Sequence, residues 1–262
     1  MRPIVTILIP SYNPGRYLVE ALDSVFKQTY PYWKAIIIDD ASTDKSLQEA
    51  SGFLNNPRVT LLHNTKNIGQ AKSLNRGFSL ADTPYTVQLD SDDCFLPETL
   101  EVLVGEAEKL PDKVGLISGN IKLIFEDSKG NVFREEVWKN RSFSERYDFL
   151  LADCSQWPRF YRTAALTNIG GWPTYGPYEG RYMEDRRVLY RLIEDYEFHW
   201  VDRELYIHRR HNKNQTNLTH IYNEMTEWLI HDTLARWGNQ YDPVFRINRC
   251  CRKEIIDLIP RS

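Results

Sequence analysis

Three carboxylates within four consecutive residues are the most distinctive chemical feature of the sequence. Asp90, Ser91, Asp92 and Asp93 directly follow the apolar stretch 85–89, which is typical of a buried strand. In an open α/β sheet, ligands bind at the carboxyl ends of the strands. Crowded carboxylates repel one another unless a cation lies among them, and an oxygen-only cluster suits Mg²⁺ or Mn²⁺. The run therefore predicts a divalent-cation site, and such ions commonly bind together with a phosphate.

Two other segments place polar side chains at the ends of predicted strands. The first contains Pro10, Tyr12 and Asn13 after the run 4–9, and the second contains Asp39 and Asp40 after the run 33–38. An aromatic ring such as Tyr12 can stack on a flat base, and a carboxylate such as Asp39 can accept the imide N–H of uracil or thymine. A simple βα turn would account for the first segment equally well. Helix capping does not account for two adjacent acids on a strand end.

Two weaker signals lie at the starts of predicted helices. Asn67 and Gly69 precede one helix, where small residues allow a ligand to approach closely, although surface turns have the same composition. Glu184 and Asp185 open a later helix with apolar positions over 188–193. An acid at the positive end of a helix is favourable in itself. That effect accounts for one of the two acids and leaves the other for chemistry.

Strand and helix patterns alternate through the first hundred residues. Apolar runs at 5–9, 33–38, 59–62 and 86–89 are separated by helical spacing at 18–26, 71–80 and 100–107. This alternation predicts right-handed crossovers and a parallel sheet.

After Gly115 the pattern changes. Residues 116–125 and 132–138 predict a hairpin, and two amphipathic helices are expected at 225–237 and 244–259. We predict one domain over 1–218, with a nucleotide-binding half 1–115 and an acceptor-binding half 116–218, and a helical extension over 219–262.

Composition limits the class of partner. The 262 residues carry a formal net charge of −3, which gives no reason to expect nucleic acid. No apolar stretch approaches the roughly 20 residues of a membrane helix. The four cysteines lack metal-site spacing, and the adjacent Cys250–Cys251 pair is a poor structural disulfide, so we expect a reduced, cytoplasmic protein.

The order of these segments resembles that of family 2 glycosyltransferases with the GT-A fold, over about residues 4–216. The matching features are Ser11-Tyr12-Asn13 after the first strand, the block 39–44, the Asn67/Gly69 loop, the block 90–93, the segment 162–172 and Glu184-Asp185. The resemblance implies an α/β fold of the nucleotide-diphospho-sugar transferase type, with a central mixed, mostly parallel sheet flanked by helices. It also implies inverting transfer of a sugar from a nucleotide-diphosphate sugar to an acceptor hydroxyl.

On the donor side, the resemblance assigns roles to several of these residues. Tyr12 and Asp39 would hold the base, which favours uridine, with thymidine as the alternative because both offer the same imide edge. Asp90 would lie near the ribose and Asp92 would bind Mg²⁺ or Mn²⁺. Asp93 would replace Asp92 as the metal ligand if the strand ended one residue later.

On the acceptor side, the resemblance implies that Asp185 is the general base and that Glu184 supports the helix start or touches the acceptor. The polar loop 208–216 offers donors, His211 first among them, that could close over the diphosphate; a solvated basic turn has the same composition. The acceptor pocket is expected within residues 151–182. A glycan or a lipid-linked precursor of a cell-envelope polysaccharide fits the family.

The C-terminal helices allow three interpretations. Packing against the main domain is the one we favour. Trp228, Trp237 and the basic cluster 246–253 would also suit peripheral docking on the inner face of a membrane, or a homodimer contact.

Other functions remain open at the level of sequence. A sugar nucleotidyltransferase also combines an α/β sheet with acids and a metal, but it usually carries a Gly-rich basic loop after the first strand, where this chain has a single Gly and a single Arg at 11–16. A receiver-like signalling module would need an acid pair on the first strand. A glycosyltransferase-like protein that binds nucleotide without catalysis would not need Asp185.

Overall fold

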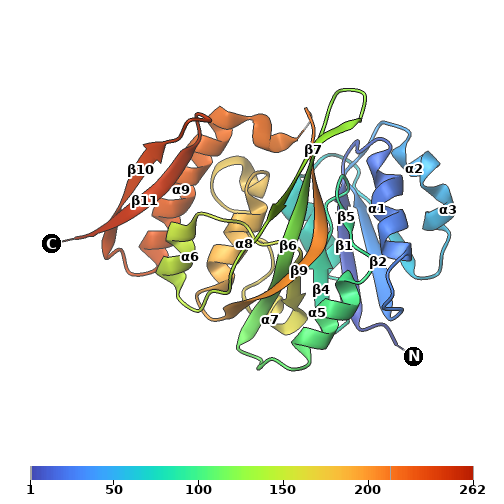
Figure 1. Cartoon of the computed structure of the whole chain (residues 1–262), viewed down its shortest axis with the longest axis horizontal. Coiled ribbons are helices and arrows are strands. Elements are labelled where there is room, and N and C mark those ends of the chain that lie inside the picture. Colours follow the sequence, from blue (N-terminus) through green and yellow to red (C-terminus); the bar gives the residue numbers. More distant parts are fainter. Residues whose placement is uncertain (1, 213, 262) are drawn as a thin grey trace.

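The computed structural model describes residues 2–212 and 214–261. Its central feature is a nine-stranded sheet (Figure 1). Its strand order is β3-β2-β1-β4-β8-β6-β9-β5, with β7 paired to β6. The strands of the sheet are β1 (Val5–Ser11), β2 (Trp33–Asp39), β3 (Val59–His63), β4 (Tyr85–Gln88), β5 (Cys94–Phe95), β6 (Val114–Glu126), β7 (Val132–Trp138), β8 (Arg159–Arg162) and β9 (Glu197–Arg210). The helices are α1 (Tyr17–Phe26), α2 (Ser46–Glu49), α3 (Ser51–Leu54), α4 (Gln70–Phe78), α5 (Thr99–Ala107), α6 (Arg146–Ala152), α7 (Thr163–Asn168), η1 (Pro177–Gly180), α8 (Glu184–Leu192), η2 (Gln215–Asn217) and α9 (Thr219–Arg236).

The N-terminal half of the sheet is parallel, as the alternating pattern predicts. β1 to β4 run in one direction, and their registers place Ser11 beside Asp39 and Asp39 beside His63. β1 is buried along its whole length because helices cover both faces of the sheet. Ile7 shares a core with α1 and α5, and Leu8 shares the opposite core with α4, α8 and α9. The loops after these strands therefore meet at one edge of the sheet.

The second half of the sheet brings a distant strand next to the acidic run. β4 pairs antiparallel with β8, and β6 and β9 run parallel to each other. The predicted hairpin is confirmed, since β6 and β7 pair antiparallel. The short strand β5 pairs with the end of β9, where Cys94 lies opposite Ile207. The acids at 90–93 consequently lie beside the carboxyl end of β9.

The C-terminal segment is a helix followed by a β-hairpin rather than two helices. α9 confirms the first predicted helix and begins earlier, at Thr219. The second predicted helix is wrong, because β10 (Tyr241–Ile247) and β11 (Lys253–Pro260) pair antiparallel. β-branched and aromatic residues, which favour strands, recur in both segments. Cys251 takes a left-handed φ of 57° between the strands. Ile255 is buried in the core that contains α9, so the extension packs against the main domain.

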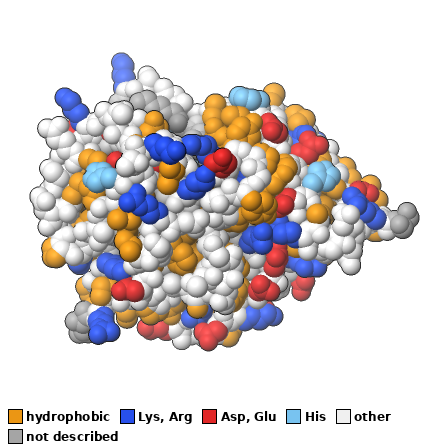
Figure 2. Space-filling view, turned by 180° about the vertical axis from the view of Figure 1, so that it is seen from behind, with side chains coloured by type: hydrophobic (Ala, Val, Ile, Leu, Met, Phe, Trp, Pro, Cys, Tyr) orange, Lys and Arg blue, Asp and Glu red, His pale blue; other side chains and the backbone are white. Residues whose placement is uncertain are grey.

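The helices, the cysteines and the surface add three observations. Among the described residues, no helix combines the length and the apolarity needed to cross a bilayer. All four cysteines are free thiols, as their spacing predicts. On the face seen from behind in Figure 2, Lys and Arg side chains gather near the upper centre, and hydrophobic side chains are interspersed with polar surface.

Candidate functional site

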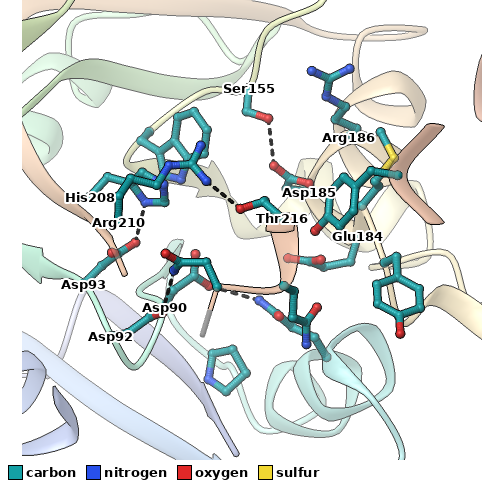
Figure 3. Close-up of a pocket in the computed structure, with 18 of the residues that line it drawn as sticks. Asp90, Asp92, Asp93, Ser155, Glu184, Asp185, Arg186, His208, Arg210 and Thr216 are labelled. Carbon is teal, nitrogen blue, oxygen red and sulfur yellow. Dashed lines mark hydrogen bonds and ion pairs between the residues drawn. The ribbon is translucent and has the colours of Figure 1, made fainter. Parts of the chain in front are cut away.

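One cavity gathers nearly all the residues that the sequence singles out. It has a volume of about 890 Å³ and is lined by the loops that follow β1, β2, β4 and β9 and by the start of α8. The predicted residues that line it are Pro10, Tyr12, Asn13, Asn67, Gly69, Asp90, Ser91, Asp92, Asp93, Glu184, Asp185 and His211. Figure 3 shows Asp90, Asp92 and Asp93 on one side, with His208 and Arg210 next to Asp93, and Glu184, Asp185 and Arg186 on the facing side. Thr216 lies between the two sides.

Asp93 is fully engaged by the protein. Its Oδ1 accepts the backbone N–H of Arg209 at 2.7 Å, and its Oδ2 lies 2.9 Å from the Tyr206 hydroxyl and 3.0 Å from Nδ1 of His208. The side chain is 1% exposed. Each contact uses a lone pair that a metal ion would need, which argues against Asp93 as the metal ligand.

Asp92 is the better candidate for a metal ligand. Its side chain is 30% exposed, and its Oδ2 lies 3.1 Å from Nε2 of His211 and 3.3 Å from Nδ2 of Asn214. The His211 ring stacks on Tyr17, with 4.9 Å between the ring centroids, which fixes its orientation. Within residues 2–212 and 214–261, no group of three or more His, Cys, Asp and Glu side chains is arranged around a metal position. A carboxylate and an imidazole on the cavity wall fit an ion whose other ligands come from a diphosphate and water.

A buried arginine that sequence reasoning missed connects the two sides of the cavity. Arg159, on β8, is 2% exposed; its Nη2 donates to Oδ2 of Asp90 at 2.9 Å, and its Nη1 lies 3.6 Å from Oδ2 of Asp185. The other oxygen of Asp90 accepts from Gln70 and Gln88 at 3.0 and 2.8 Å. Burial alone would lower the pKa of Arg159, but Asp90 and Asp185 outweigh burial and hold that pKa above its ordinary value. One cation therefore compensates both carboxylates.

Asp185 is the carboxylate best placed to act as a base. It is the second residue of α8, and the positive end of a helix favours an ionised acid. Its Oδ2 accepts from Oγ of Ser155 at 2.8 Å, and its side chain remains 18% exposed. Met183 takes a left-handed φ of 55° immediately before the helix, at the point where the chain turns into α8. The acid is thus anchored through one oxygen on the wall of the cavity.

Glu184 differs from its neighbour in burial and protonation. It is 8% exposed and also lines the cavity. Burial, with the nearby charges of Asp185 and Asp90, raises the pKa of Glu184 to about 8, and Arg159 opposes that rise. Glu184 consequently binds a proton more readily than an ordinary carboxyl group and, when protonated, can donate a hydrogen bond.

Asn13 holds together the loops after β1 and β2. Its Oδ1 accepts the backbone N–H of Thr43 at 2.7 Å, and its own N–H donates to Oγ of Ser42 at 2.9 Å. Asn13 takes a φ of 50°, a left-handed conformation that Asn tolerates better than most residues. Tyr12 beside it is 52% exposed, which leaves its ring accessible for stacking.

The two adjacent acids after β2 have different surroundings. Asp40 lines the cavity and accepts the backbone N–H groups of Ile68 and Gly69 at 2.8 Å each, which fixes the loop that enters α4. Gly69 has a φ of 88°, and a Cβ there would lie 2.7 Å from Cγ of Arg181, so only glycine fits. Asp39, which was predicted to hold the base, is not among the lining residues. Its Oδ2 lies 3.2 Å from Nδ1 of His63 and its side chain is 5% exposed, so its role stays a prediction.

The predicted loop 208–216 begins later than expected, because β9 continues to Arg210. Arg209 pairs with Glu20 and Glu126 beneath the cavity and has a structural role. Arg210 lines the cavity, as does Arg252 from the C-terminal hairpin. Lys213 of the predicted loop lies outside the described residues. The basic cluster 246–253 was the one sequence signal for Arg252, and it was assigned to a helix.

The glycosyl transferase family 2 profile matches residues 6–170. The chain belongs to this family. Among family relatives, it is 33% identical over 134 residues to the glycosyltransferase GlyG of Streptococcus pneumoniae. The matched stretch covers 51% of this chain and 44% of GlyG. It is 35% identical over 109 residues to WcaA of Escherichia coli, a putative colanic acid biosynthesis glycosyl transferase, covering 41% of this chain and 39% of the relative. The chain thus spans less than half the length of these relatives.

Solved structures show that the fold is GT-A, as the resemblance implies. TarS of Staphylococcus aureus in complex with UDP-GlcNAc superimposes with a TM-score of 0.70 at 19% identity, over 91% of this chain and 67% of TarS. The mannosyltransferase PcManGT of Pyrobaculum calidifontis, in complex with GDP-Man and Mn²⁺, superimposes with a TM-score of 0.63 at 19% identity, over 91% and 65% of the two chains.

Proposed function

We propose that this family 2 glycosyltransferase moves a sugar from a nucleotide-diphosphate sugar, most readily a UDP-sugar, to a hydroxyl of a glycan or cell-envelope polysaccharide precursor, with inversion at the anomeric carbon. The carrying observation is that Asp92 with His211 faces Asp185 across one cavity. The donor diphosphate can lie against Asp92 and His211 while the acceptor hydroxyl reaches Asp185. The UDP-GlcNAc complex of TarS and the colanic acid role in the name of WcaA support this choice of substrates.

On the donor side, we assign the base to the end of the cavity at Tyr12 and Asn67, where a ring and small loop residues offer a stacking surface. Asp39 remains our candidate for the imide N–H, and it would have to exchange its contact with His63 for that bond. Asp92 and His211 would hold Mg²⁺ or Mn²⁺, which when bound supplies Lewis-acid stabilisation of the charge on the departing diphosphate.

On the acceptor side, Asp185 takes the proton of the attacking hydroxyl. Inversion needs a single base on the face opposite the leaving group. Ser155 and Arg159 hold the carboxylate in place and compensate its charge. Positioned general-base catalysis contributes about 10²–10⁴ in rate. Burial raises the pKa of Glu184, and its protonated form can donate a hydrogen bond to an acceptor oxygen.

The test is UDP release from a panel of UDP-sugars, with Mn²⁺ and acceptor extracts, by the wild type, Asp185→Asn and Asp195→Asn. Asp195 is an exposed acid after α8 and serves as the matched control. We expect Asp185→Asn to lose about 10²-fold or more in turnover with UDP affinity unchanged, and Asp195→Asn to behave as the wild type. Near-normal turnover by Asp185→Asn would refute the assignment of the base.

A further inference from the structure

Two arginines on the wall of the cavity converge on one residue. Arg210, the last residue of β9, donates from Nη1 to Oγ1 of Thr216 at 2.5 Å, and Arg252, at the turn of the C-terminal hairpin, donates from Nη2 to the backbone oxygen of Thr216 at 2.9 Å. Both side chains are partly buried and line the cavity. The two guanidinium groups are therefore held on either side of the same short segment.

Neither guanidinium has an acidic partner among the residues that the structure describes. Within residues 2–212 and 214–261, no carboxylate lies within ion-pair distance of Arg210 or Arg252, although many other ion pairs form. Asp92 and Asp93 act on Arg210 only from beyond ion-pair distance, and two other acids of the cavity wall are already paired, Asp153 with Arg186 and Glu254 with Arg246. Two adjacent cations without a counter-charge repel each other unless an anion lies between them.

The position of the pair favours the acceptor as the source of that anion. Arg252 belongs to the hairpin 241–260, outside the profile match 6–170 and outside the nucleotide-binding half of the sheet. Tyr222 of α9 also lines this wall, and Asp185 and Arg210 both influence its pKa, which is raised chiefly by burial. Arg252 therefore reaches the cavity from the side of α9, because Asn223 bonds to the backbone of Cys251 and Lys253. Arg210 approaches from the end of β9, next to His211.

We propose that Arg210 and Arg252 bind an anionic group, a phosphate or a carboxylate, on the acceptor glycan. The proposal rests on the proposed function and specifies its acceptor as an acidic glycan or sugar phosphate. Guanidinium groups suit this task because their planar donors match the oxygens of phosphate and carboxylate. The C-terminal hairpin is then part of the acceptor site rather than a separate extension.

The test uses the whole chain saturated with UDP and Mg²⁺, titrated with inorganic phosphate and, separately, with glucuronic acid. The variants are Arg252→Gln, Arg210→Gln and the control Arg249→Gln, which makes the same charge change at an exposed position of the same turn. We expect at least one probe to bind the UDP-saturated wild type and the Arg249 variant. Arg252→Gln and Arg210→Gln are expected to weaken that binding by about 10- to 100-fold, with the UDP affinity of Arg252→Gln within about twofold of the wild type.

Three results would overturn the proposal. If neither probe binds the UDP-saturated wild type, the pair is not an anion site separate from the donor. If Arg252→Gln and Arg210→Gln weaken UDP binding as much as they weaken phosphate binding, the pair holds the donor diphosphate instead. If both variants bind the probes normally, the anion site lies elsewhere. Failure of the wild type to bind UDP at all would instead refute the proposed function. A titration with UDP before the phosphate and glucuronic acid titrations distinguishes that case.

Discussion

Replacing Arg159 with methionine removes a cation that the donor side and the base share. Its guanidinium is 2% exposed, and it lies 2.9 Å from Asp90 and 3.6 Å from Asp185. Removing one partner of a buried ion pair costs about 3–5 kcal/mol, because the remaining charge stays buried without compensation. We expect Arg159→Met to lose free energy of unfolding in that range at pH 8.

The loss depends on pH in a defined direction. Without Arg159, the charges of Asp90 and Asp185 lack their buried counter-charge, and binding a proton relieves that cost in the folded variant. A folded state that binds protons more readily than the unfolded chain loses stability as the pH rises, so the stability of the variant falls relative to that of the wild type at higher pH. The destabilisation is therefore expected to be smaller at pH 5 than at pH 8.

Urea unfolding at both pH values, together with the pH dependence of UDP release, measures this effect. The acid limb of the rate profile is expected to move to higher pH, because Asp185 must be ionised to act as a base. Arg162→Met is the control: Arg162 lies on the same strand but donates to the backbone oxygens of Ala107, Leu110 and Val114. It is expected to destabilise equally at both pH values. An equal loss by Arg159→Met at pH 5 and pH 8, with an unchanged rate profile, would refute the shared-cation role.

Two further predictions concern the other acids of the cavity. Asp93→Asn is expected to lower the free energy of unfolding by about 1–3 kcal/mol, because Asp93 accepts hydrogen bonds from Arg209 and Tyr206. Mn²⁺-dependent UDP binding is expected to persist in this variant. Loss of that binding with unchanged stability in urea would contradict the structural role of Asp93. Because burial raises the pKa of Glu184 to about 8, the wild type is expected to lose stability as the pH rises from about 4.5 towards 8, by up to about 1.4 kcal/mol per pH unit. Glu184→Gln cannot ionise and is expected to remove this slope, so parallel stability curves for the two proteins would contradict the burial argument.

The sequence predicts the donor side of the site because strand ends are local features. Apolar runs that stop at Pro10, Asp39 or Asp90 identify the carboxyl edge of a parallel sheet, and that edge gathers their loops in the structure. The order of the segments then predicts the GT-A fold, which the solved structures confirm. The base at Asp185 and the ligand at Asp92 follow from family resemblance and remain predictions.

Long-range contacts determine what the sequence could not supply. Asp92 and Asp93 are equivalent in sequence, and they differ because β9 brings Tyr206 and His208 to Asp93 alone. Arg159 looks like an ordinary strand residue until β8 pairs with β4 and places it beside Asp90. The spacing of the apolar residues in the segment 241–260 is compatible with a helix and with strands. The antiparallel pairing of β10 with β11 makes the segment a hairpin.

Calorimetric titration of UDP into the wild type and Asp92→Asn, with and without Mn²⁺, tests the central claim most directly. The claim is that the donor diphosphate and a metal ion meet at Asp92 on the wall opposite Asp185. We expect Mn²⁺ to tighten UDP binding to the wild type by about tenfold or more, and Asp92→Asn to abolish that gain. Equal UDP affinity with and without Mn²⁺, or a full Mn²⁺ gain in Asp92→Asn, would contradict the account.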